Sequence, residues 1–252
     1  MDRGEAQSAI AGCEPEGKKM RSKALVKPAA AASRLVGVIA SPAALARAAR
    51  LRQPPDFFEL RLDALCGSLG EVAHAIPKLR APLILTARHP LEGGAGELKS
   101  GARRALLRRF LGHAALVDLE LRCVRQMKLL IDEMRRRKID LIISRHDLRD
   151  TPSLDELHRL TKFAATFKPA FFKIVTRTDT PAQLARLVSF FGERDRAKFP
   201  IAAMGIGKLG LESRRRLDRL GTALIYVSLG EANVQGQPSL SQLRCARRAY
   251  IR

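Results

Sequence analysis

Residues 139–175 read IDLIISRHDLRDTPSLDELHRLTKFAATFKPAFFKIV, and this stretch indicates the fold. It begins and ends with apolar runs, at 139–143 and 170–175, each of the usual length of a strand. Between them, the segment 151–156 (TPSLDE) offers an N-cap, an early proline and acidic residues for the first turn of a helix. A strand, a helix and a second strand in this order are typical of a parallel sheet covered by helices.

The same alternation continues on both sides of this stretch. Six further apolar runs predict strands, at 35–40, 57–62, 82–86, 115–119, 199–203 and 223–227. Amphipathic stretches such as 102–112 and 122–137 predict helices between them. Eight strand–helix units favour a single α/β domain, a (β/α)8 TIM barrel, and no Gly-rich phosphate loop follows the first run to suggest an open doubly wound sheet. We therefore expect a barrel catalytic domain over 34–252, preceded by a flexible, basic N-terminal extension over 1–33.

The chain is strongly basic, because 46 Lys and Arg residues against 25 Asp and Glu give a formal net charge of +21. This balance first suggests binding to nucleic acid, since Lys and Arg neutralise phosphates whatever the base sequence. Hydrophobic residues make up 46% of the chain, enough for a sizeable core, and no stretch is apolar and long enough to predict a membrane span. The four cysteines are far apart and form no CxxC pair, which favours a reducing cytoplasm over a disulfide framework or a zinc ribbon.

One residue near the carboxyl end of a predicted strand is unusual, and that end of a barrel is where active sites form. Lys173 lies within the apolar run 170–175, in a strand that should be buried on both faces. A buried ammonium is costly unless it is paired or loses its proton, and an unprotonated lysine can form a Schiff base with a ketone. The alternatives are a structural ion pair, or an edge strand with the amine in water.

His146 follows the preceding strand, so neighbouring strands should bring it close enough to Lys173 for one substrate to touch both. We expect this histidine, with a pKa near neutrality, to act as a general base that removes a proton next to the imine carbon. An ordinary, partly buried histidine is the alternative. The other histidines show no paired ligand spacing, so we expect no metal site.

Three arginines, Arg61, Arg88 and Arg214, lie at or soon after predicted strand ends on the same face. Because arginine suits bidentate binding of carboxylates, they predict an anionic substrate, although solvated surface charges are the alternative in so arginine-rich a chain. Glu59 lies two residues before Arg61 and is expected to hold its guanidinium. Glu92 precedes two glycines and marks either a mobile loop tip or a plain turn.

Short motifs of this sequence, in their order along the chain, resemble those of the type I 3-dehydroquinate dehydratases. They are ELRLD at 59–63, TAR at 86–88, EGG at 92–94, DLEL at 118–121, SRHD at 144–147, TP at 151–152, Lys173, MG at 204–205, SR at 213–214 and GQ at 236–237. The set spreads over nearly the whole predicted barrel.

This resemblance implies a hydro-lyase that dehydrates 3-dehydroquinate to 3-dehydroshikimate in the shikimate pathway of aromatic amino acid biosynthesis. It implies no cofactor and no metal, a homodimer, a Schiff base on Lys173, His146 as the general acid and base, and a site-ordering role for Glu92. The remaining matches imply substrate binding: Arg214 and Gln237 to the carboxylate, and Glu59, Arg61 and Arg88 to the ring hydroxyls.

The loop at 233–237 departs from the family pattern, since it reads NVQGQ where the family usually has SAPGQ. Asn233 can still form a hydrogen bond to a substrate. Losing the proline should make this loop less rigid and weaken substrate binding.

Two other functions stay open, a basic nucleic-acid-binding protein on a barrel scaffold and another Schiff-base barrel lyase such as an aldolase. The first rests on charge alone, because the chain has no zinc finger, no RNP-type aromatic motif and only 5% aromatic residues. The second shares Lys173 but not the whole ordered set of motifs. We therefore expect a small-molecule substrate and a cytoplasmic enzyme that binds neither nucleic acid nor a membrane.

Overall fold

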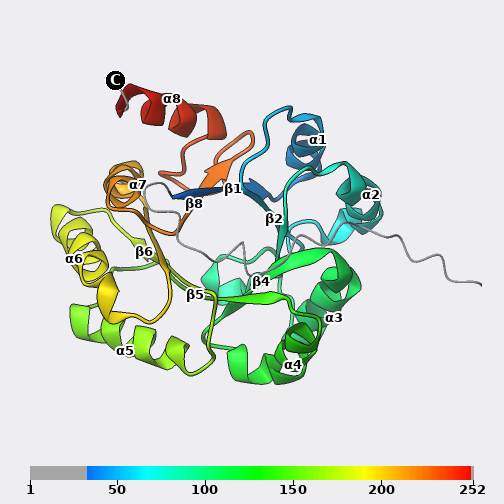
Figure 1. Cartoon of the computed structure of the whole chain (residues 1–252), viewed down its shortest axis with the longest axis horizontal. Coiled ribbons are helices and arrows are strands. Elements are labelled where there is room, and N and C mark those ends of the chain that lie inside the picture. Colours follow the sequence, from blue (N-terminus) through cyan, green and yellow to red (C-terminus); the bar gives the residue numbers. More distant parts are fainter. Residues whose placement is uncertain (1–32, 251–252) are drawn as a thin grey trace, which may run out of the picture.

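The computed structural model describes residues 33–250, so the extension expected over 1–33 lies, except for Ser33, outside the described residues. Figure 1 shows a ring of strands surrounded by helices, with one α-helix after each strand. The strands are β1 Arg34–Ile39, β2 Phe57–Arg61, β3 Leu83–Thr86, β4 Ala114–Glu120, β5 Asp140–Asp147, β6 Phe171–Arg177, β7 Ile201–Ile206 and β8 Leu224–Ser228. The α-helices are α1 Pro42–Arg50, α2 Leu69–Ala75, α3 Ser100–Phe110, α4 Lys128–Arg136, α5 Leu154–Ala165, α6 Pro181–Gly192, α7 Gly210–Arg219 and α8 Leu240–Tyr250.

Short 3-10 helices complete the connections between these elements. They are η2 Cys66–Ser68, η3 Ile76–Lys78, η4 Pro90–Glu92, η5 Leu111–His113, η6 Val124–Met127 and η7 Arg194–Arg196. The predicted helix 102–112 is therefore α3 followed by η5, and the predicted helix 122–137 is η6 followed by α4.

The strands form one parallel sheet in the order β7-β6-β5-β4-β3-β2-β1-β8, which confirms the predicted barrel. The two end strands of this sheet, β7 and β8, are joined by hydrogen bonds at their amino-terminal ends. The Ala223 amide donates to the Ile201 carbonyl at 2.9 Å, and the Thr222 hydroxyl accepts from the Ala203 amide at 2.9 Å. The same hydroxyl lies 3.3 Å from the Ala203 carbonyl. A threonine side chain thus contributes to closing the barrel between β7 and β8.

Three strands run at least two residues further than their apolar runs predict, since β5 continues to Asp147, β6 to Arg177 and β7 to Ile206. The polar residues that follow the apolar part of β5 still pair with β6, with His146 opposite Val175. The apolar run of β5 ends at residue 143, before the strand does, because residues 144–147 lie at the polar mouth of the barrel. The helix after β5 begins as expected, with Ser153 accepting from the Glu156 amide at 3.2 Å, although Pro152 precedes this N-cap.

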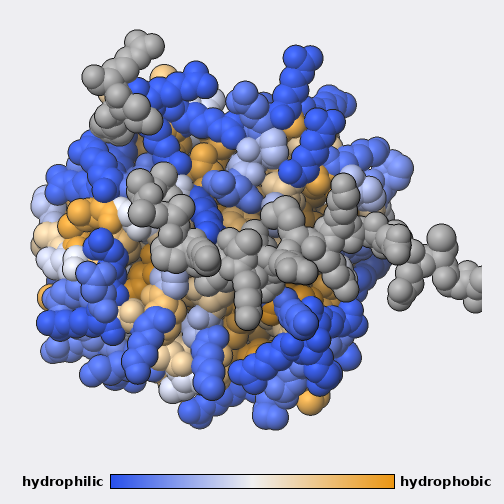
Figure 2. Space-filling view, in the orientation of Figure 1, coloured by the Kyte–Doolittle hydropathy of each residue, from blue (hydrophilic) through white to orange (hydrophobic). Residues whose placement is uncertain are grey.

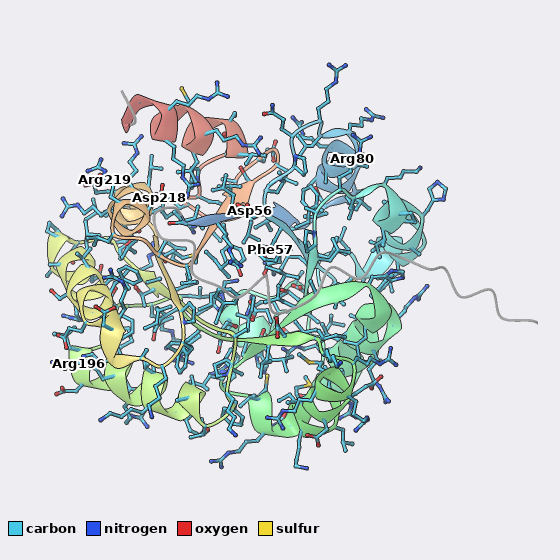
Figure 3. The ribbon with its side chains drawn as sticks, viewed as in Figure 1. Asp56, Phe57, Arg80, Arg196, Asp218 and Arg219 are labelled. Carbon is cyan, nitrogen blue, oxygen red and sulfur yellow. The ribbon has the colours of Figure 1, made fainter. Side chains whose placement is uncertain are left out.

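The core has two layers, one inside the barrel and one between the sheet and the helices. Strand β6 shows the alternation that separates them: Phe171 and Val175 belong to the inner cluster, and Phe172 and Ile174 to the outer one. Lys173 therefore shares the inward face of β6. Figure 3 shows Phe57, another inner residue, near the centre of the barrel.

Buried polar side chains stand two residues beyond inner apolar residues on five of the strands. They are Glu59 on β2, Thr86 on β3, Asp118 on β4, Ser144 on β5 and Lys173 on β6, and the phenol of Tyr226 stands at the same level on β8. The barrel thus encloses an apolar layer with a polar layer towards its carboxyl-terminal mouth.

Much of the face seen in Figure 2 is hydrophilic, and many of the Lys and Arg residues of the described chain are exposed. Arg80, Arg196 and Arg219, for example, are exposed at the periphery (Figure 3). Within residues 33–250, no helix is both long and apolar enough to cross a membrane.

We predict that Thr222→Val destabilises the protein by about 1–3 kcal/mol, because valine keeps the shape but leaves the buried Ala203 amide unpaired. Urea unfolding would measure this. The matched control is Thr166→Val, which removes a hydroxyl bonded to the Phe163 carbonyl at the exposed end of α5 and should cost less than about 0.5 kcal/mol. Equal losses for both variants would show that Thr222 does not contribute to closure.

Candidate active site

A pocket opens at the carboxyl ends of the strands, the end that the sequence predicted. It is lined by side chains from β1, β2, β5, β6, β7 and β8 and by the loops that follow the strands. All nine residues singled out from the sequence line it: Glu59, Arg61, Arg88, Glu92, His146, Lys173, Arg214, Asn233 and Gln237.

Lys173 lies deep in this pocket and is only 4% exposed. Its Nζ is 3.1 Å from Asp118 Oδ2 and 3.4 Å from Glu59 Oε1, and it lies 3.8 Å from the centroid of the Tyr226 ring. The edge-strand alternative is wrong, because β6 lies between β5 and β7. The alternative of a structural ion pair holds in part, because Lys173 does pair with Asp118 and Glu59. It is incomplete because the same amine also lines a pocket, where a substrate can reach it.

Arg88 holds the carboxylates that face the lysine. Its guanidinium donates to Asp118 at 2.9 and 3.3 Å, to Glu120 at 3.1 Å and to the Ser144 hydroxyl at 2.8 Å. Burial alone would raise the pKa of Asp118, but Arg88 and Lys173 lower it well below its usual range, so Asp118 remains a carboxylate. Burial would likewise lower the pKa of Arg88, but the carboxylates raise it well above its usual value.

A second arginine extends this arrangement beneath the pocket. Arg103, from α3, is fully buried, pairs with Glu120 and donates from Nε to the Ala87 carbonyl at 2.6 Å. Glu120 also accepts from the His89 amide at 3.0 Å. The carboxylate of Glu120 is therefore shared between two buried guanidinium groups.

His146 and Glu92 form a pair at the pocket wall. Glu92 Oε2 accepts from the His146 amide at 2.8 Å and lies 3.0 Å from its ring Nδ1. When Glu92 is ionised, its carboxylate holds the proton on Nδ1 and leaves Nε2 as the basic nitrogen. Burial and the nearby charges of Arg88 and Lys173 lower the pKa of His146 well below its usual value. The near-neutral pKa that the sequence suggested is therefore corrected, and His146 is neutral at physiological pH.

Glu92 is itself buried, and it lies near two further cations. Arg122 Nε is 3.4 Å and Arg145 Nη1 is 3.5 Å from its Oε1. Burial nevertheless raises the pKa of Glu92 to about 7. The glutamate that the sequence placed at a loop tip is thus a titrating group packed against His146.

The pairing expected between Glu59 and Arg61 is wrong. Arg61 forms a bidentate pair with Asp63, at 3.0 and 2.7 Å, and donates to the Gly93 carbonyl at 3.1 Å. Glu59 instead accepts from the Thr86 hydroxyl at 2.9 Å and faces Lys173. Asp63 is the better partner because it lies just beyond the end of β2, where it also accepts from the Arg88 and Ala95 amides.

Arg214 projects from α7 and is 2% exposed. One Nη donates to the Tyr226 carbonyl at 3.0 Å and lies 3.4 Å from the Met204 sulfur, whereas Nε has no hydrogen-bond partner among the described residues. No carboxylate of residues 33–250 forms an ion pair with it, and burial lowers its pKa to about 10. This buried cation without a counter-charge fits an anionic ligand.

The loop after β8 closes on itself over the pocket. Gln237 Oε1 accepts from the backbone amide of Asn233 at 2.8 Å and from its side chain at 3.0 Å. Gly236 has a φ of +85°, and a Cβ there would lie 2.7 Å from the Gly210 Cα. Asn233 therefore ties together the loop that lacks the usual proline.

Sequence reasoning assigned no role in the site to four residues that hold it, Asp118, Glu120, Arg103 and Tyr226, although Asp118 and Glu120 belong to the DLEL motif. The alternation of Asp118 and Glu120 along an apolar strand was a usable signal, because a buried lysine needs a counter-charge. Tyr226 lies in an apolar run and Arg103 in a helix rich in basic residues, so nothing in the sequence around either residue indicated a role in the site.

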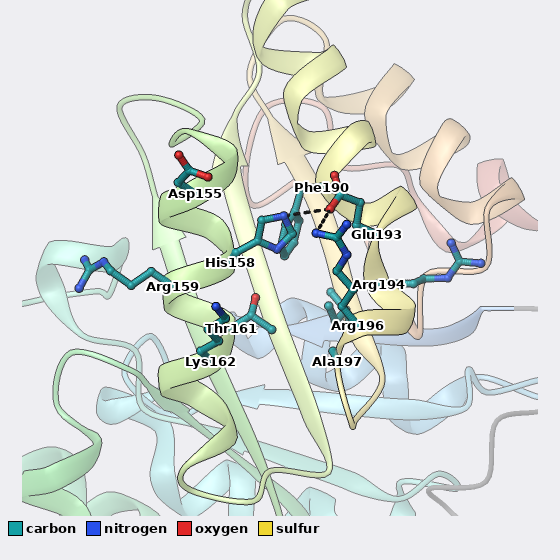
Figure 4. Close-up of a pocket in the computed structure, with 11 residues that line it drawn as sticks. Asp155, His158, Arg159, Thr161, Lys162, Phe190, Glu193, Arg194, Arg196 and Ala197 are labelled. Atoms are coloured by element: carbon teal, nitrogen blue, oxygen red, sulfur yellow. Dashed lines mark ion pairs between the residues drawn. The ribbon is translucent and has the colours of Figure 1, made fainter.

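A second hollow lies between α5 and α6 and contains none of the nine residues. His158 Nε2 is 3.3 Å from Glu193 Oε2, which also pairs with Arg196 at 2.7 Å. Arg159 and Arg194 point away from this hollow (Figure 4). Its charges are therefore mostly paired or directed outward. Within the described part of the chain, no group of three His, Cys, Asp or Glu residues is arranged to hold a metal ion.

The fold and the pocket define a class of protein: a (β/α)8 barrel whose mouth holds a buried lysine, a neutral histidine and an arginine that forms no ion pair within residues 33–250. The family model described as type I 3-dehydroquinase matches residues 39–250. The chain belongs to this family.

Similar proteins agree with this assignment. The 3-dehydroquinate dehydratase of Pyrobaculum aerophilum is 34% identical over 194 residues, which cover 74% of this chain and 61% of that relative. The enzyme of that name from Dehalococcoides mccartyi is 29% identical over 190 residues, with 74% and 82% covered. The structure of 3-dehydroquinate dehydratase from Enterococcus faecalis matches with a TM-score of 0.72 and 25% identity, over 81% of this chain and 92% of that one.

We predict that the buried carboxyl of Glu92 makes stability depend on pH. Between pH 4.5 and 7, native Glu92 keeps a proton that the unfolded chain has released, so this residue's contribution to the free energy of unfolding falls as pH rises. Relative to Glu92→Gln, which cannot titrate, the wild type should lose about 3 kcal/mol across this range.

Chemical unfolding of both proteins at several pH values would measure this difference. Glu97→Gln, on the exposed part of the same loop, is the matched control and should follow the wild type. A constant difference between wild type and Glu92→Gln from pH 4.5 to 7 would contradict the raised pKa.

Proposed function

We propose that the protein is a 3-dehydroquinate dehydratase, a hydro-lyase that converts 3-dehydroquinate to 3-dehydroshikimate in the shikimate pathway through an imine on Lys173. Membership of the type I family supports the reaction. The observation that carries the mechanism is a buried lysine that shares one pocket with a neutral histidine and with an arginine that has no counter-charge among the described residues.

The first step joins Lys173 to the substrate ketone. The ammonium releases a proton, its nitrogen attacks the C3 carbonyl, and the carbonyl oxygen leaves as water, which gives a protonated imine. His146, held neutral by burial and by the nearby cations, is ready to accept a proton in this pocket. Asp118 and Glu59, which contact Nζ, stabilise the positive charge that remains on the nitrogen.

The second step removes water from the ring. The protonated imine withdraws electrons and acidifies the C2 proton, which His146 takes through Nε2. The same residue, now an acid, gives the proton to the C1 hydroxyl as that group leaves as water. Hydrolysis of the imine then releases the enone and restores Lys173. Glu92 orders the site by fixing the His146 ring through Nδ1.

Substrate binding falls mainly to the residues around the lysine. Arg214 binds the carboxylate, because its Nε is unpartnered among the described residues, and Gln237 and Asn233 close over it from the loop. The ring hydroxyls lie against Glu59, Arg61 and Arg88. Both of these arginines are already bonded to carboxylates, which fixes their orientation before substrate arrives.

The proposal includes a homodimer in the cytoplasm. The dimer follows from the family resemblance, and light scattering of the purified chain would test it. Three of the cysteines, Cys66, Cys123 and Cys245, are free thiols, which suits a reducing compartment.

Borohydride trapping separates the roles of the two central residues. Lys173→Met should abolish both turnover and the adduct that borohydride traps with 3-dehydroquinate. His146→Gln should lose about 10²–10⁴-fold in turnover yet still form the adduct on Lys173, because it removes only the acid–base group. Absorbance of the conjugated product and peptide mass spectrometry give the two readouts.

Matched controls come from exposed residues of the same types, Lys162→Met and His113→Gln, which should keep the parent's rate. Circular dichroism would verify that each variant is folded. Turnover by Lys173→Met at the parent's rate, or an adduct on another residue, would overturn the proposal.

A further inference from the structure

Among residues 33–250, Tyr226 is the only Phe, Tyr or Trp that lines the pocket, and it belongs to none of the motifs that carry the family resemblance. It projects from β8 into the barrel, is 3% exposed, and places its ring centroid 3.8 Å from Lys173 Nζ. A cation this close to an aromatic face is attracted by the ring quadrupole, most strongly where water is excluded.

Other groups also surround the lysine nitrogen, and each comes from a different strand. Asp118 on β4 and Glu59 on β2 contact it directly, whereas Arg88 and His146 share its pocket from the ends of β3 and β5. The two carboxylates bind the ammonium through its N–H donors. The Tyr226 ring instead attracts the positive charge of the nitrogen through its quadrupole and needs no N–H donor.

This distinction matters when the lysine reacts. An ammonium has three N–H donors, whereas a protonated imine has one, because the other two hydrogens leave with the carbonyl oxygen as water. The nitrogen can then no longer donate to both Asp118 and Glu59. The attraction to the ring face needs no N–H and persists through this change.

We infer that the ring face of Tyr226 stabilises the protonated imine at Lys173 and so acts as a positioning residue for the covalent intermediate. This inference rests on the proposed function. The ring, and not the hydroxyl, carries the effect, because the buried Tyr226 hydroxyl has no hydrogen-bond partner within residues 33–250. Burial and the nearby Glu59 and Asp118 raise the pKa of this phenol well above its usual value, so it remains neutral.

A fluorine series tests the ring's electrostatics at constant shape. In the full chain, Tyr226→Phe serves as the reference, and phenylalanines with one, two and three ring fluorines replace the same residue, each fluorine weakening the negative face. We expect the fraction of enzyme trapped by borohydride with 3-dehydroquinate, and kcat, to fall stepwise along the series. The total loss should be about 3- to 30-fold, and KM should change less.

Phe57, which lies in the inner core but does not line the pocket, is the matched control. The same fluorinated residues there should leave trapping and kcat unchanged. Tyr226→Leu, which removes the face entirely, should trap no more than the most fluorinated member of the series.

The outcomes separate two kinds of failure. If the wild type forms an adduct on Lys173 but trapping is constant along the series, the role of Tyr226 is overturned and the proposed function stands. If the wild type forms no adduct with 3-dehydroquinate, the proposed function fails and the inference fails with it.

Discussion

A row of alternating buried charges runs from the outer helices into the centre of the barrel: Arg103, Glu120, Arg88, Asp118 and Lys173. Each carboxylate lies between two cations, so no charge in the row is left unpaired. Taking charges out of water is costly, and removing one partner from such a group typically costs about 3–5 kcal/mol. The site therefore depends on the complete row, and the lysine keeps its position because four other charges keep theirs.

The barrel supplies the spacing that this row requires. Inward side chains recur every second residue along a strand, so a polar layer can stand directly above an apolar one. Asp118 and Lys173 meet across the barrel because their strands place them in that layer, and Arg88 reaches both Asp118 and Glu120 from the end of β3. Because these side chains are already held in place, they need not move when a charged intermediate forms. Such preorganisation is the usual source of electrostatic catalysis.

The sequence predicted the eight strand–helix units and nine of the residues that line the pocket, because apolar periodicity and residue order are local properties. It did not predict which charges meet. Arg61 pairs with Asp63 and not with Glu59, since the choice depends on how the chain turns after β2. Arg103 lies in a helix rich in arginine, and only the packing of α3 against the sheet distinguishes it from its exposed neighbours. The lowered pKa of His146 likewise follows from burial and from cations brought by other strands.

The central claim is that substrate bonds to Lys173 while its carboxylate neutralises Arg214. A crystal structure of the protein after borohydride reduction with 3-dehydroquinate tests it most directly. We predict a covalent bond between Nζ and the former ketone carbon, with the carboxylate within hydrogen-bond distance of Arg214 Nε. An adduct whose carboxylate lies away from Arg214, or a ligand that is not bonded to Lys173, would contradict it.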